Sequence, residues 1–404
     1  MTDAARVLLP ALRPVFTGED VTRLIELRRD LHRHPELSWQ EERTARRLAD
    51  VLASLGAVEI TRPARTGVVA RFAGRDRAAP VVAVRGDIDA LPIDEATGLP
   101  FASATPGVMH ACGHDIHATW AIGAALLLAR SPATGDVLVV LQPAEEVGEG
   151  AKAILETGAL EDARAIFGGH VDRRFAVGEV VAEAGPLAAS ADSFEIELTG
   201  TGAHGARPHE SADPIVGAAA LVGALQTIVS RRLDPAAAAV VTVGTLHAGT
   251  APNVIPETAV LTGTLRATTP ETRTAIGDEV RRLAESVAAA YRLSARVVVH
   301  WGTPPIVNPP GPARWARHAV MALLGERAVV PFGVTNMGGE DFAFYLERIP
   351  GCFMRIGARE EGGARLAAHS PRFTAAEESI FVGAAVLAES ARVASAALRK
   401  GAES

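Results

Sequence analysis

The sequence contains little cysteine and no long apolar run. Cys112 and Cys352 are the two cysteines among 404 residues, so a fold held together by disulfides is not expected at this length. No segment approaches the ~20 apolar residues that a membrane-spanning helix needs. Residues 1–14 lack a basic start, a sustained apolar stretch and a small-residue cleavage site, which argues against a secretory signal. We therefore expect a cytoplasmic protein with no membrane partner.

An excess of positive charge is also absent. The formal net charge is -7, and phosphate binding needs clustered Lys and Arg, so nucleic acid is not an expected partner. Hydrophobic residues make up 48% and charged residues 22%, which is the balance of an ordinary globular protein. A chain of 404 residues exceeds what one hydrophobic core usually serves, so two domains are expected.

In the first part of the chain, helices alternate with apolar strands. Residues 20–55 show helical spacing that is interrupted at His34-Pro35-Glu36, because the residue before a proline disfavours a helix. Residues 118–130 predict a further helix. The Val-rich or apolar runs that are typical of buried strands are 67–72, 80–85, 136–141 and 165–167. Buried strands that alternate with helices predict a mostly parallel α/β sheet.

The pattern changes near Gly185. Residues 192–198 alternate polar and apolar side chains, which is the period of a half-exposed strand. The elements predicted after it are a helix at 215–230, strands at 239–246 and 258–267, a helix at 270–290 and a strand at 295–300. This order describes an α+β sandwich, which we interpret as an inserted domain.

Potential metal ligands are densest at residues 109–117. Cys112 and His114 are a soft and a borderline ligand, placed two residues apart around a glycine. Alternatively, Cys112 is a small buried hydrophobic residue and the histidines are hydrogen-bonded loop residues. His110 and His117 are better suited to supporting or packing roles, because a metal-bound imidazole needs an orienting partner.

Two adjacent carboxylates, Glu145 and Glu146, follow the strand predicted at 136–141. Adjacent side chains point in different directions, so one can hold a metal while the other faces a bound water. A glutamate beside such a water is the usual general base of hydrolytic metal sites. The alternative is a pair of acidic residues that begins a helix, where the helix dipole favours negative charge.

Two further histidines, His170 and His369, are candidate ligands. A histidine that follows a strand is often structural, since histidine has many uses other than metal binding. The side chains expected at or just beyond the carboxyl ends of parallel strands are Asp87, Cys112, Glu146 and His170. Open α/β sheets bind ligands at these ends, so the convergence favours one shared site over separate packing roles.

Short motifs occur in a characteristic order between about Leu27 and Leu387. They are Arg85-Gly-Asp-Ile-Asp-Ala-Leu-Pro92, His110-Ala-Cys-Gly-His-Asp115, Gln142-Pro-Ala-Glu-Glu146, Gly200-Thr-Gly-Ala-His204, Pro252-Asn-Val-Ile-Pro256, Gly338-Gly-Glu-Asp-Phe342 and His369-Ser-Pro-Arg-Phe373. Together they resemble the aminoacylase and carboxypeptidase family of metallohydrolases. The branch that they resemble most includes hippurate hydrolase and the plant indole-acetyl-amino-acid hydrolases.

The resemblance implies two divalent metal ions per subunit. Cys112 would bridge or bind both ions, and the other ligands would be His114, Glu146, His170 and His369. Zn, Mn, Co or Ni would suit such a mixed sulfur, nitrogen and oxygen site. The implied fold class is α/β, with a mostly parallel-sheet catalytic domain at 1–185 and 303–404. An inserted α+β sandwich at 186–302 would be a dimerisation domain, in a homodimer or a tetramer.

The implied activity is metal-dependent hydrolysis of the amide bond in small N-acyl amino acids, such as acetyl or benzoyl derivatives. Glu145 would take a proton from the attacking water and deliver it to the leaving amine. The other implied roles are oxyanion stabilisation by His204, binding of the substrate carboxylate by Asn253 and Arg266, and orientation of a ligand by Asp87. In such enzymes the dimerisation domain can lend substrate-binding residues to the neighbouring subunit.

Some positions leave the substrate and the function open. Gly169 stands where many relatives have a bulky residue, and Ile116 where they have glycine, so the pocket is less defined than the reaction. Asp341 either supports the site or caps a turn, and Cys352 is expected in the core. The alternative functions are a carboxypeptidase or dipeptidase acting on short peptides, a cysteine hydrolase using Cys112 with His114, and a non-catalytic relative that binds small molecules.

Overall fold

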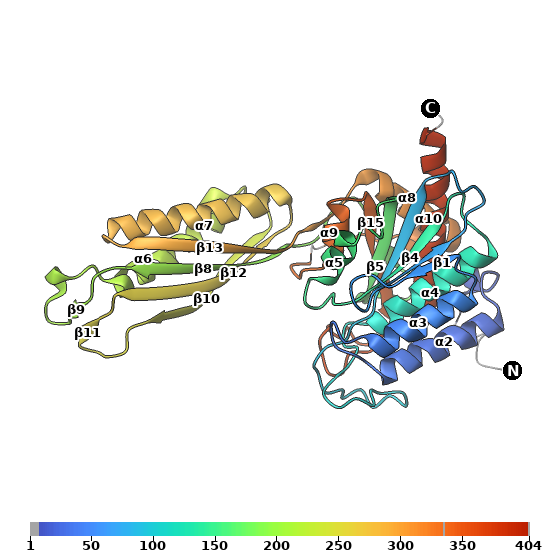
Figure 1. The fold of residues 1–404 in the computed structure, drawn as a ribbon, viewed down its shortest axis with the longest axis horizontal. Helices are drawn as coiled ribbons and strands as arrows, with labels where there is room; N and C mark the ends of the chain where they lie inside the picture. The colour runs from blue at the N-terminus through green and yellow to red at the C-terminus, as the bar shows by residue number, and fades with distance from the viewer. Residues whose placement is uncertain (1–7, 334–335, 403–404) are drawn as a thin grey trace. The chain divides into compact units, whose positions relative to one another are not determined.

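The computed structural model describes residues 8–333 and 336–402 (Figure 1). Within these residues the chain divides into two compact units. The first unit comprises 8–185, 308–333 and 344–402, and the second comprises 186–307 and 336–343. The domain limits expected from the sequence differ from this division at 303–307 and 336–343, which belong to the second unit.

The first unit contains a sheet that has seven strands within the described residues. Their order across the sheet is β1 (Glu59–Thr61), β2 (Val68–Phe72), β4 (Val137–Gln142), β3 (Val81–Asp87), β5 (Ala163–Ala176), β15 (Gly351–Arg359) and β6 (Val180–Val181). The central strands β4, β3, β5 and β15 are parallel to one another, which confirms the predicted parallel core of the sheet.

The strand predicted at 67–72 is antiparallel to its neighbour. β2 pairs antiparallel with both β1 and β4. A parallel connection needs a crossover of a dozen or more residues, and only residues 73–80 link β2 to β3. The short link therefore reverses the direction of the chain.

Helices cover the sheet of the first unit. They are η1 (Pro10–Leu12), α2 (Gly18–Arg33), α3 (Glu42–Ser54), α4 (His114–Arg130), α5 (Gly150–Glu156), α8 (Pro310–Leu324), η4 (Glu326–Ala328) and α10 (Glu378–Ala402); the short helix α9 (Phe342–Leu346) follows η4 in the sequence. α2 ends before Pro35, as predicted, and Thr17 and Asp20 form a capping box at its start. α4 begins at His114 rather than at residue 118, and it is buried from His114 to Leu128.

The second unit is an antiparallel sheet with helices packed against it. The strands, in order across the sheet, are β10 (Ala239–Ala248), β12 (Thr258–Ala267), β8 (Ala191–Thr199) and β13 (Ser294–Thr303). α6 (Pro214–Thr227), η3 (Ile228–Arg232) and α7 (Pro270–Ala290) share a core with the sheet, around Phe194, Ile196 and Leu221. The predicted order of strands and helices is confirmed.

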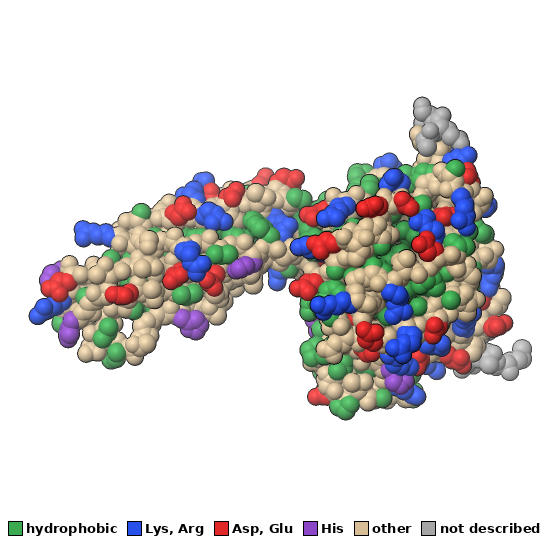
Figure 2. Space-filling model, in the orientation of Figure 1, with side chains coloured by type: hydrophobic (Ala, Val, Ile, Leu, Met, Phe, Trp, Pro, Cys, Tyr) green, Lys and Arg blue, Asp and Glu red, His purple; other side chains and the backbone are tan. Residues whose placement is uncertain are grey.

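Short elements complete the two units. Two-residue strands β9 (Ala203–His204) and β11 (Val254–Ile255) pair in the second unit, where η2 (Pro208–Glu210) follows β9. β7 (Gly185–Ala188) pairs with β14 (Ile306–Asn308). On the face drawn in Figure 2, acidic and basic side chains are interspersed over the first unit, so the surface charge there is mixed in sign.

Two helices among the described residues are long and apolar enough to cross a membrane, although the sequence predicted no such segment. They are Pro214–Arg232 and Glu378–Gly401, with mean hydropathy of 1.4 and 1.5. The apolar stretch of Glu378–Gly401 is 72% buried, because α10 packs in the core of the first unit. The stretch in Pro214–Arg232 is 33% buried and leaves apolar side chains such as Ile215 and Val216 exposed.

Candidate metal centre

The predicted ligands and the predicted supporting residue Asp87 lie on loops, on strands and at the start of α4, at one edge of the first unit's sheet. Asp87 ends β3, and Glu146 lies in the turn that follows β4, as expected for the carboxyl ends of parallel strands. His170 instead lies inside β5, which continues to Ala176 and pairs with β15. Cys112 does not follow a strand directly, since it lies in the turn that precedes α4. The turn at Glu146 also precedes α5, so the alternative of two acids in a first helical turn is wrong.

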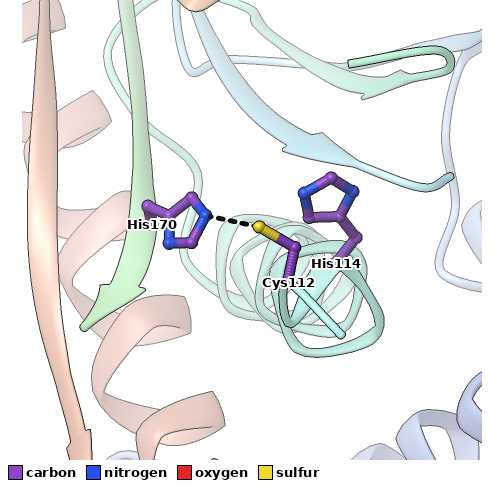
Figure 3. Close-up of side chains that lie close together, drawn as sticks. All are labelled: Cys112, His114 and His170. Atoms are coloured by element: carbon purple, nitrogen blue, oxygen red, sulfur yellow. Dashed lines mark hydrogen bonds between the residues drawn. The ribbon is translucent and has the colours of Figure 1, made fainter. Parts of the chain in front are cut away.

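Cys112 and His170 are in direct contact (Figure 3). The Cys112 Sγ lies 3.2 Å from His170 Nε2. His170 Nδ1 lies 2.7 Å from the Val171 carbonyl oxygen, so this nitrogen carries the proton and Nε2 presents its lone pair to the sulfur. His114 joins these two residues in one group whose donor atoms lie within 4.8 Å of one another.

Gly113 allows Cys112 and His114 to approach this group from the same turn. Its φ is 89°, a left-handed conformation that glycine adopts without the steric penalty that a Cβ atom brings. A Cβ atom at this position would lie 2.6 Å from Val171 Cγ2. The glycine is therefore required both by the backbone conformation and by the space available.

His114 is oriented by Asp89, a residue for which the sequence predicted no role. His114 Nδ1 lies 3.0 Å from the Asp89 carbonyl oxygen and 3.2 Å from its Oδ1. His114 Nε2 is thereby directed towards the two glutamates, at 3.8 Å from Glu145 Oε2 and 3.7 Å from Glu146 Oε1. Asp89 also accepts a hydrogen bond from Glu146 N at 3.1 Å, so it positions two candidate ligands at once.

Asp87 was expected to orient a ligand, and its closest histidine is instead His117. Asp87 Oδ1 lies 2.6 Å from His117 Nδ1, and Arg85 forms an ion pair with the other carboxylate oxygen. His117 Nε2 accepts a hydrogen bond from Val171 N at 3.0 Å. Both nitrogens of His117 are thus engaged, which fits the supporting role expected for it. Asp87 Oδ2 lies 3.8 Å from His114 Nε2.

Glu146 and His369 form the more exposed side of the cluster. His369 Nε2 lies 3.4 Å from Glu146 Oε2, and the side chain of His369 is 55% exposed. The backbone of His369 has a φ of 66°, and its N–H donates to the Ala111 carbonyl oxygen at 2.9 Å. Cys112, Glu146 and His369 form a second group of donor atoms within 4.8 Å of one another. The site is therefore accessible from the His369 side.

The residues present fit a bound divalent metal. His114 Nε2 and Glu146 Oε1 are buried, 3.7 Å apart, and have no hydrogen-bond partner among the described residues. Buried polar atoms are normally paired, and a cation between these two would satisfy both. The thiol, imidazole and carboxylate donors around them match the preferences of zinc and neighbouring metals.

Burial perturbs the protonation of the candidate ligands. Burial raises the pKa of the Cys112 thiol, and the negative charges of Glu146 and Glu145 raise it further. Burial also raises the pKa of Glu146, against the opposing charges of His114 and His369. Burial lowers the pKa of His114, but Asp87 and Asp89 outweigh it and hold that pKa well above its usual value. Metal binding must therefore displace protons, at least from Cys112.

The predicted substrate-binding residues lie in the second unit, in two separate places. His204 is paired with Val254 across β9 and β11, and Gly205 N donates to the Asn253 carbonyl oxygen at 2.8 Å. His204 Nδ1 accepts from Ala206 N at 3.0 Å, so its Nε2 carries the proton and can donate.

Arg266 is far from these residues. Arg266 lies opposite Val240 near the end of β12. Asn253 and β11 instead directly precede the start of β12 in the sequence. Seven residues of strand between Ala259 and Arg266 correspond to roughly 23 Å. The expectation that Asn253 and Arg266 bind one carboxylate therefore fails for two residues of the same subunit.

A cluster of this composition at the edge of an α/β sheet is that of a metal-dependent hydrolase. Residues 83–392 match Peptidase family M20/M25/M40, and the chain belongs to this family. The family resemblance seen in the motifs is confirmed.

Curated relatives and a solved structure are similar along nearly the whole chain. N-acetyl-L-cysteine deacetylase of Bacillus subtilis is 41% identical, over 94% of this chain and 90% of its own. The IAA-amino acid hydrolase ILR1-like 2 of Arabidopsis thaliana is 37% identical, over 91% of this chain and 84% of its own. The crystal structure of the Bacillus subtilis YXEP protein, a dinuclear metal binding peptidase, is 39% identical with a TM-score of 0.83, over 94% of this chain and 99% of that chain.

Proposed function

We propose that this protein is a metal-dependent amidohydrolase that removes the acyl group from small N-acyl amino acids. The observation that carries the proposal is the group of thiol, imidazole and carboxylate donors around two buried atoms, His114 Nε2 and Glu146 Oε1, which have no hydrogen-bond partner among the described residues. Family membership supports the same class of reaction. The similarity to a deacetylase of N-acetyl-L-cysteine makes N-acetyl amino acids the first substrates to test.

Two divalent ions would be held by Cys112, His114, Glu146, His170 and His369. Cys112 belongs both to the group with His114 and His170 and to the group with Glu146 and His369, which suits a sulfur shared between two ions. The relative described as a dinuclear metal binding peptidase supports this number of ions. When bound, divalent ions would lower the pKa of the attacking water and polarise the amide carbonyl. Zn, Mn, Co and Ni all suit the donor set.

Glu145 is the proposed general base. Its Oε2 lies 3.8 Å from His114 Nε2, and Oε1 of the neighbouring residue Glu146, a proposed ligand, lies 3.7 Å from the same nitrogen. The two carboxylates therefore face the same ring nitrogen. Glu145 would accept a proton from the attacking water and then donate it to the nitrogen of the leaving amine. Its side chain is 10% exposed, so the exchange would take place largely away from bulk solvent.

Substrate binding would involve residues of both subunits in a homodimer. His204 Nε2–H is free to stabilise the developing oxyanion, because Nδ1 already accepts the Ala206 hydrogen bond. Asn253 precedes β12 and Arg266 lies near the end of that strand, so a single substrate would meet Arg266 from one subunit and His204 with Asn253 from the other. Arg266 offers a forked pair of donors for the carboxylate.

The second unit carries the surface features of a dimer interface. Its exposed large apolar side chains are Ile215, Val216, Val229, Val240, Leu246, Val254, Tyr291 and Trp301. Several of them lie on α6 and on β10, which is an outer strand of its sheet. Exposed apolar surface of this kind marks interaction sites, and an outer strand can pair with another chain.

Cleavage of short peptides is the second candidate, because the solved relative is described as a peptidase. A cysteine hydrolase would use Cys112 with His170 rather than His114, given the 3.2 Å contact. Burial raises the pKa of the Cys112 thiol and lowers that of the His170 imidazole, which disfavours the thiolate that such a reaction needs.

The test is an assay of purified protein with N-acetyl and N-benzoyl amino acids and with dipeptides, before and after treatment with a chelator. The proposal expects hydrolysis of N-acyl amino acids that a chelator abolishes and divalent metal restores. Faster cleavage of dipeptides would favour the peptidase. Hydrolysis that survives complete removal of metal would favour the cysteine hydrolase, and no hydrolysis of any substrate would favour a binding protein.

A further inference from the structure

The loop that carries Glu145 and Glu146 leaves β4 through a disfavoured backbone conformation. Ala144 directly precedes the two carboxylates, and its φ of 54° lies in the left-handed region, where a Cβ atom is unfavourable. Ala144 is fully buried, so water does not satisfy its backbone N–H. Such a conformation persists only where the surrounding structure holds it.

Glu41 supplies the contact that holds Ala144, from a position 103 residues away in the sequence. Glu41 Oε1 accepts a hydrogen bond from Ala144 N at 2.9 Å, and Oε2 accepts one from the Thr66 hydroxyl at 2.6 Å. The exposed fraction of Glu41 is 0%. A carboxylate this deeply buried is costly unless it is hydrogen-bonded, and these two contacts engage both of its oxygens.

Two other residues of the turn between α2 and α3 reach the same loop. Ser38 donates to Asp89 Oδ2 at 2.7 Å, and the same oxygen accepts from Glu146 N at 3.1 Å. Trp39 Nε1 donates to Glu149 Oε2 at 3.0 Å. The turn thus contacts the start of the loop through Glu41 and its end through Trp39, and Ser38 contacts the Asp89 oxygen that also accepts from Glu146 N.

We propose that Glu41 is a positioning residue for amide hydrolysis, which keeps Glu145 and Glu146 in place by holding the backbone of Ala144. The inference rests on the proposed function of those two glutamates as base and ligand. Glu41 acts through the backbone of the loop rather than by contact with the substrate. Its removal should therefore affect metal binding and turnover together.

The test compares Glu41→Ala and Glu41→Gln in the full-length protein, freed of metal and titrated with Co²⁺. Glu41→Ala removes the acceptor, and its Kd for Co²⁺ should rise about tenfold or more, the range seen when groups that support metal ligands are lost. Glu41→Gln keeps an acceptor for Ala144 N and offers an NH₂ donor to the Thr66 hydroxyl, so its Kd should stay within about threefold of wild type.

Turnover provides a second readout in protein saturated with Co²⁺. Glu41→Ala should lower kcat more than it raises KM, because it displaces Glu145 rather than the residues that bind substrate. If Glu41→Ala does not fold, Glu41→Asp takes its place. The Asp side chain is one methylene shorter, so its carboxylate no longer reaches Ala144 N, and the same losses in Co²⁺ affinity and kcat are expected.

Ala144→Gly tests the route of the effect. Glycine adopts positive φ without a Cβ penalty, so the backbone conformation at residue 144 should depend less on the hydrogen bond to Glu41. In a protein that also carries Ala144→Gly, Glu41→Ala should raise the Kd for Co²⁺ by a factor that is at least about threefold smaller than in the wild-type background.

Asp136→Ala is the matched control for loss of a buried carboxylate. Asp136 Oδ1 accepts a hydrogen bond from Gly74 N at 2.8 Å, and it lies before β4, at the opposite end of the strand from Glu145. This variant should unfold at lower urea concentration and should bind Co²⁺ as wild type does.

The outcomes separate this inference from the proposed function. Wild-type Co²⁺ affinity and kcat in Glu41→Ala would overturn the role of Glu41. A loss of equal size with and without Ala144→Gly would also overturn it, because Glu41 would then act by another route. A wild-type protein that binds Co²⁺ and hydrolyses no N-acyl amino acid would overturn the proposed function instead, and the Co²⁺ titrations would still decide whether Glu41 positions Glu146.

Discussion

Replacing Gly113 with alanine should destabilise the protein and displace the ligands on either side of it. Gly113 has a φ of 89°, and an added Cβ would lie 2.6 Å from Val171 Cγ2. The left-handed conformation costs alanine about 1–2 kcal/mol. The overlap with a buried side chain adds about 1–3 kcal/mol. The expected loss in the free energy of unfolding is thus about 2–5 kcal/mol, a large share of the stability of a typical domain.

Gly56→Ala is the matched control for this prediction. Gly56 has a φ of 92°, and an added Cβ would meet no heavy atom of the described residues within 4 Å. It should therefore cost only the backbone penalty of about 1–2 kcal/mol. Urea unfolding of the metal-free protein measures both losses, and Co²⁺ affinity should fall for Gly113→Ala alone. Equal losses in the two variants would refute the claim that space beside Val171 requires a glycine.

Four further changes probe the site, the pH response and the dimer. Glu145→Gln should bind metal normally and lose about 10²–10⁴-fold in turnover, and near-normal turnover would remove Glu145 from the mechanism. Cys112→Ala should deplete bound metal, and unchanged metal content on elemental analysis would rule out its role as ligand. Burial raises the pKa of Glu95, but hydrogen bonds from His32, Thr97 and Ser103 lower it to about 2 from 4.5, so its contribution to stability is present above pH 4.5 and is lost as the pH falls towards 2. Glu95→Gln should flatten the fall in unfolding free energy over that range, and an unchanged slope would contradict the assignment. Val216→Arg, on the exposed side of α6, should give a monomer on size-exclusion chromatography that is nearly inactive, and a fully active monomer would refute shared substrate binding.

Much of the fold follows from local patterns in the sequence. Pro35 ends α2 because its ring is incompatible with the helix, and Val-rich runs mark β3 and β4 as strands buried on both faces. Alternation at 192–198 marks β8 as a strand with one buried and one partly exposed face. The extent of β5 was missed, because its length depends on pairing with β15, nearly two hundred residues later in the sequence.

The candidate ligands could be chosen from their chemistry and their order, while the residues that orient them could not. Asp87 and Asp89 occupy the same motif, and only the fold shows that Asp89 contacts His114 and that Asp87 contacts His117. Glu41 has no local signal at all, since its partner Ala144 is brought to it by tertiary structure. Such contacts depend on the three-dimensional arrangement of loops rather than on any spacing in the sequence.

The most direct test of the account is to measure metal content and hydrolysis on the same preparation. Equilibrium dialysis against Co²⁺ or Zn²⁺ should give two ions per chain, and hydrolysis of N-acetyl amino acids should appear as the sites fill. Both should be lost in Cys112→Ala. Hydrolysis by a preparation that contains no bound divalent metal, or a chain that binds no metal tightly, would contradict the central claim.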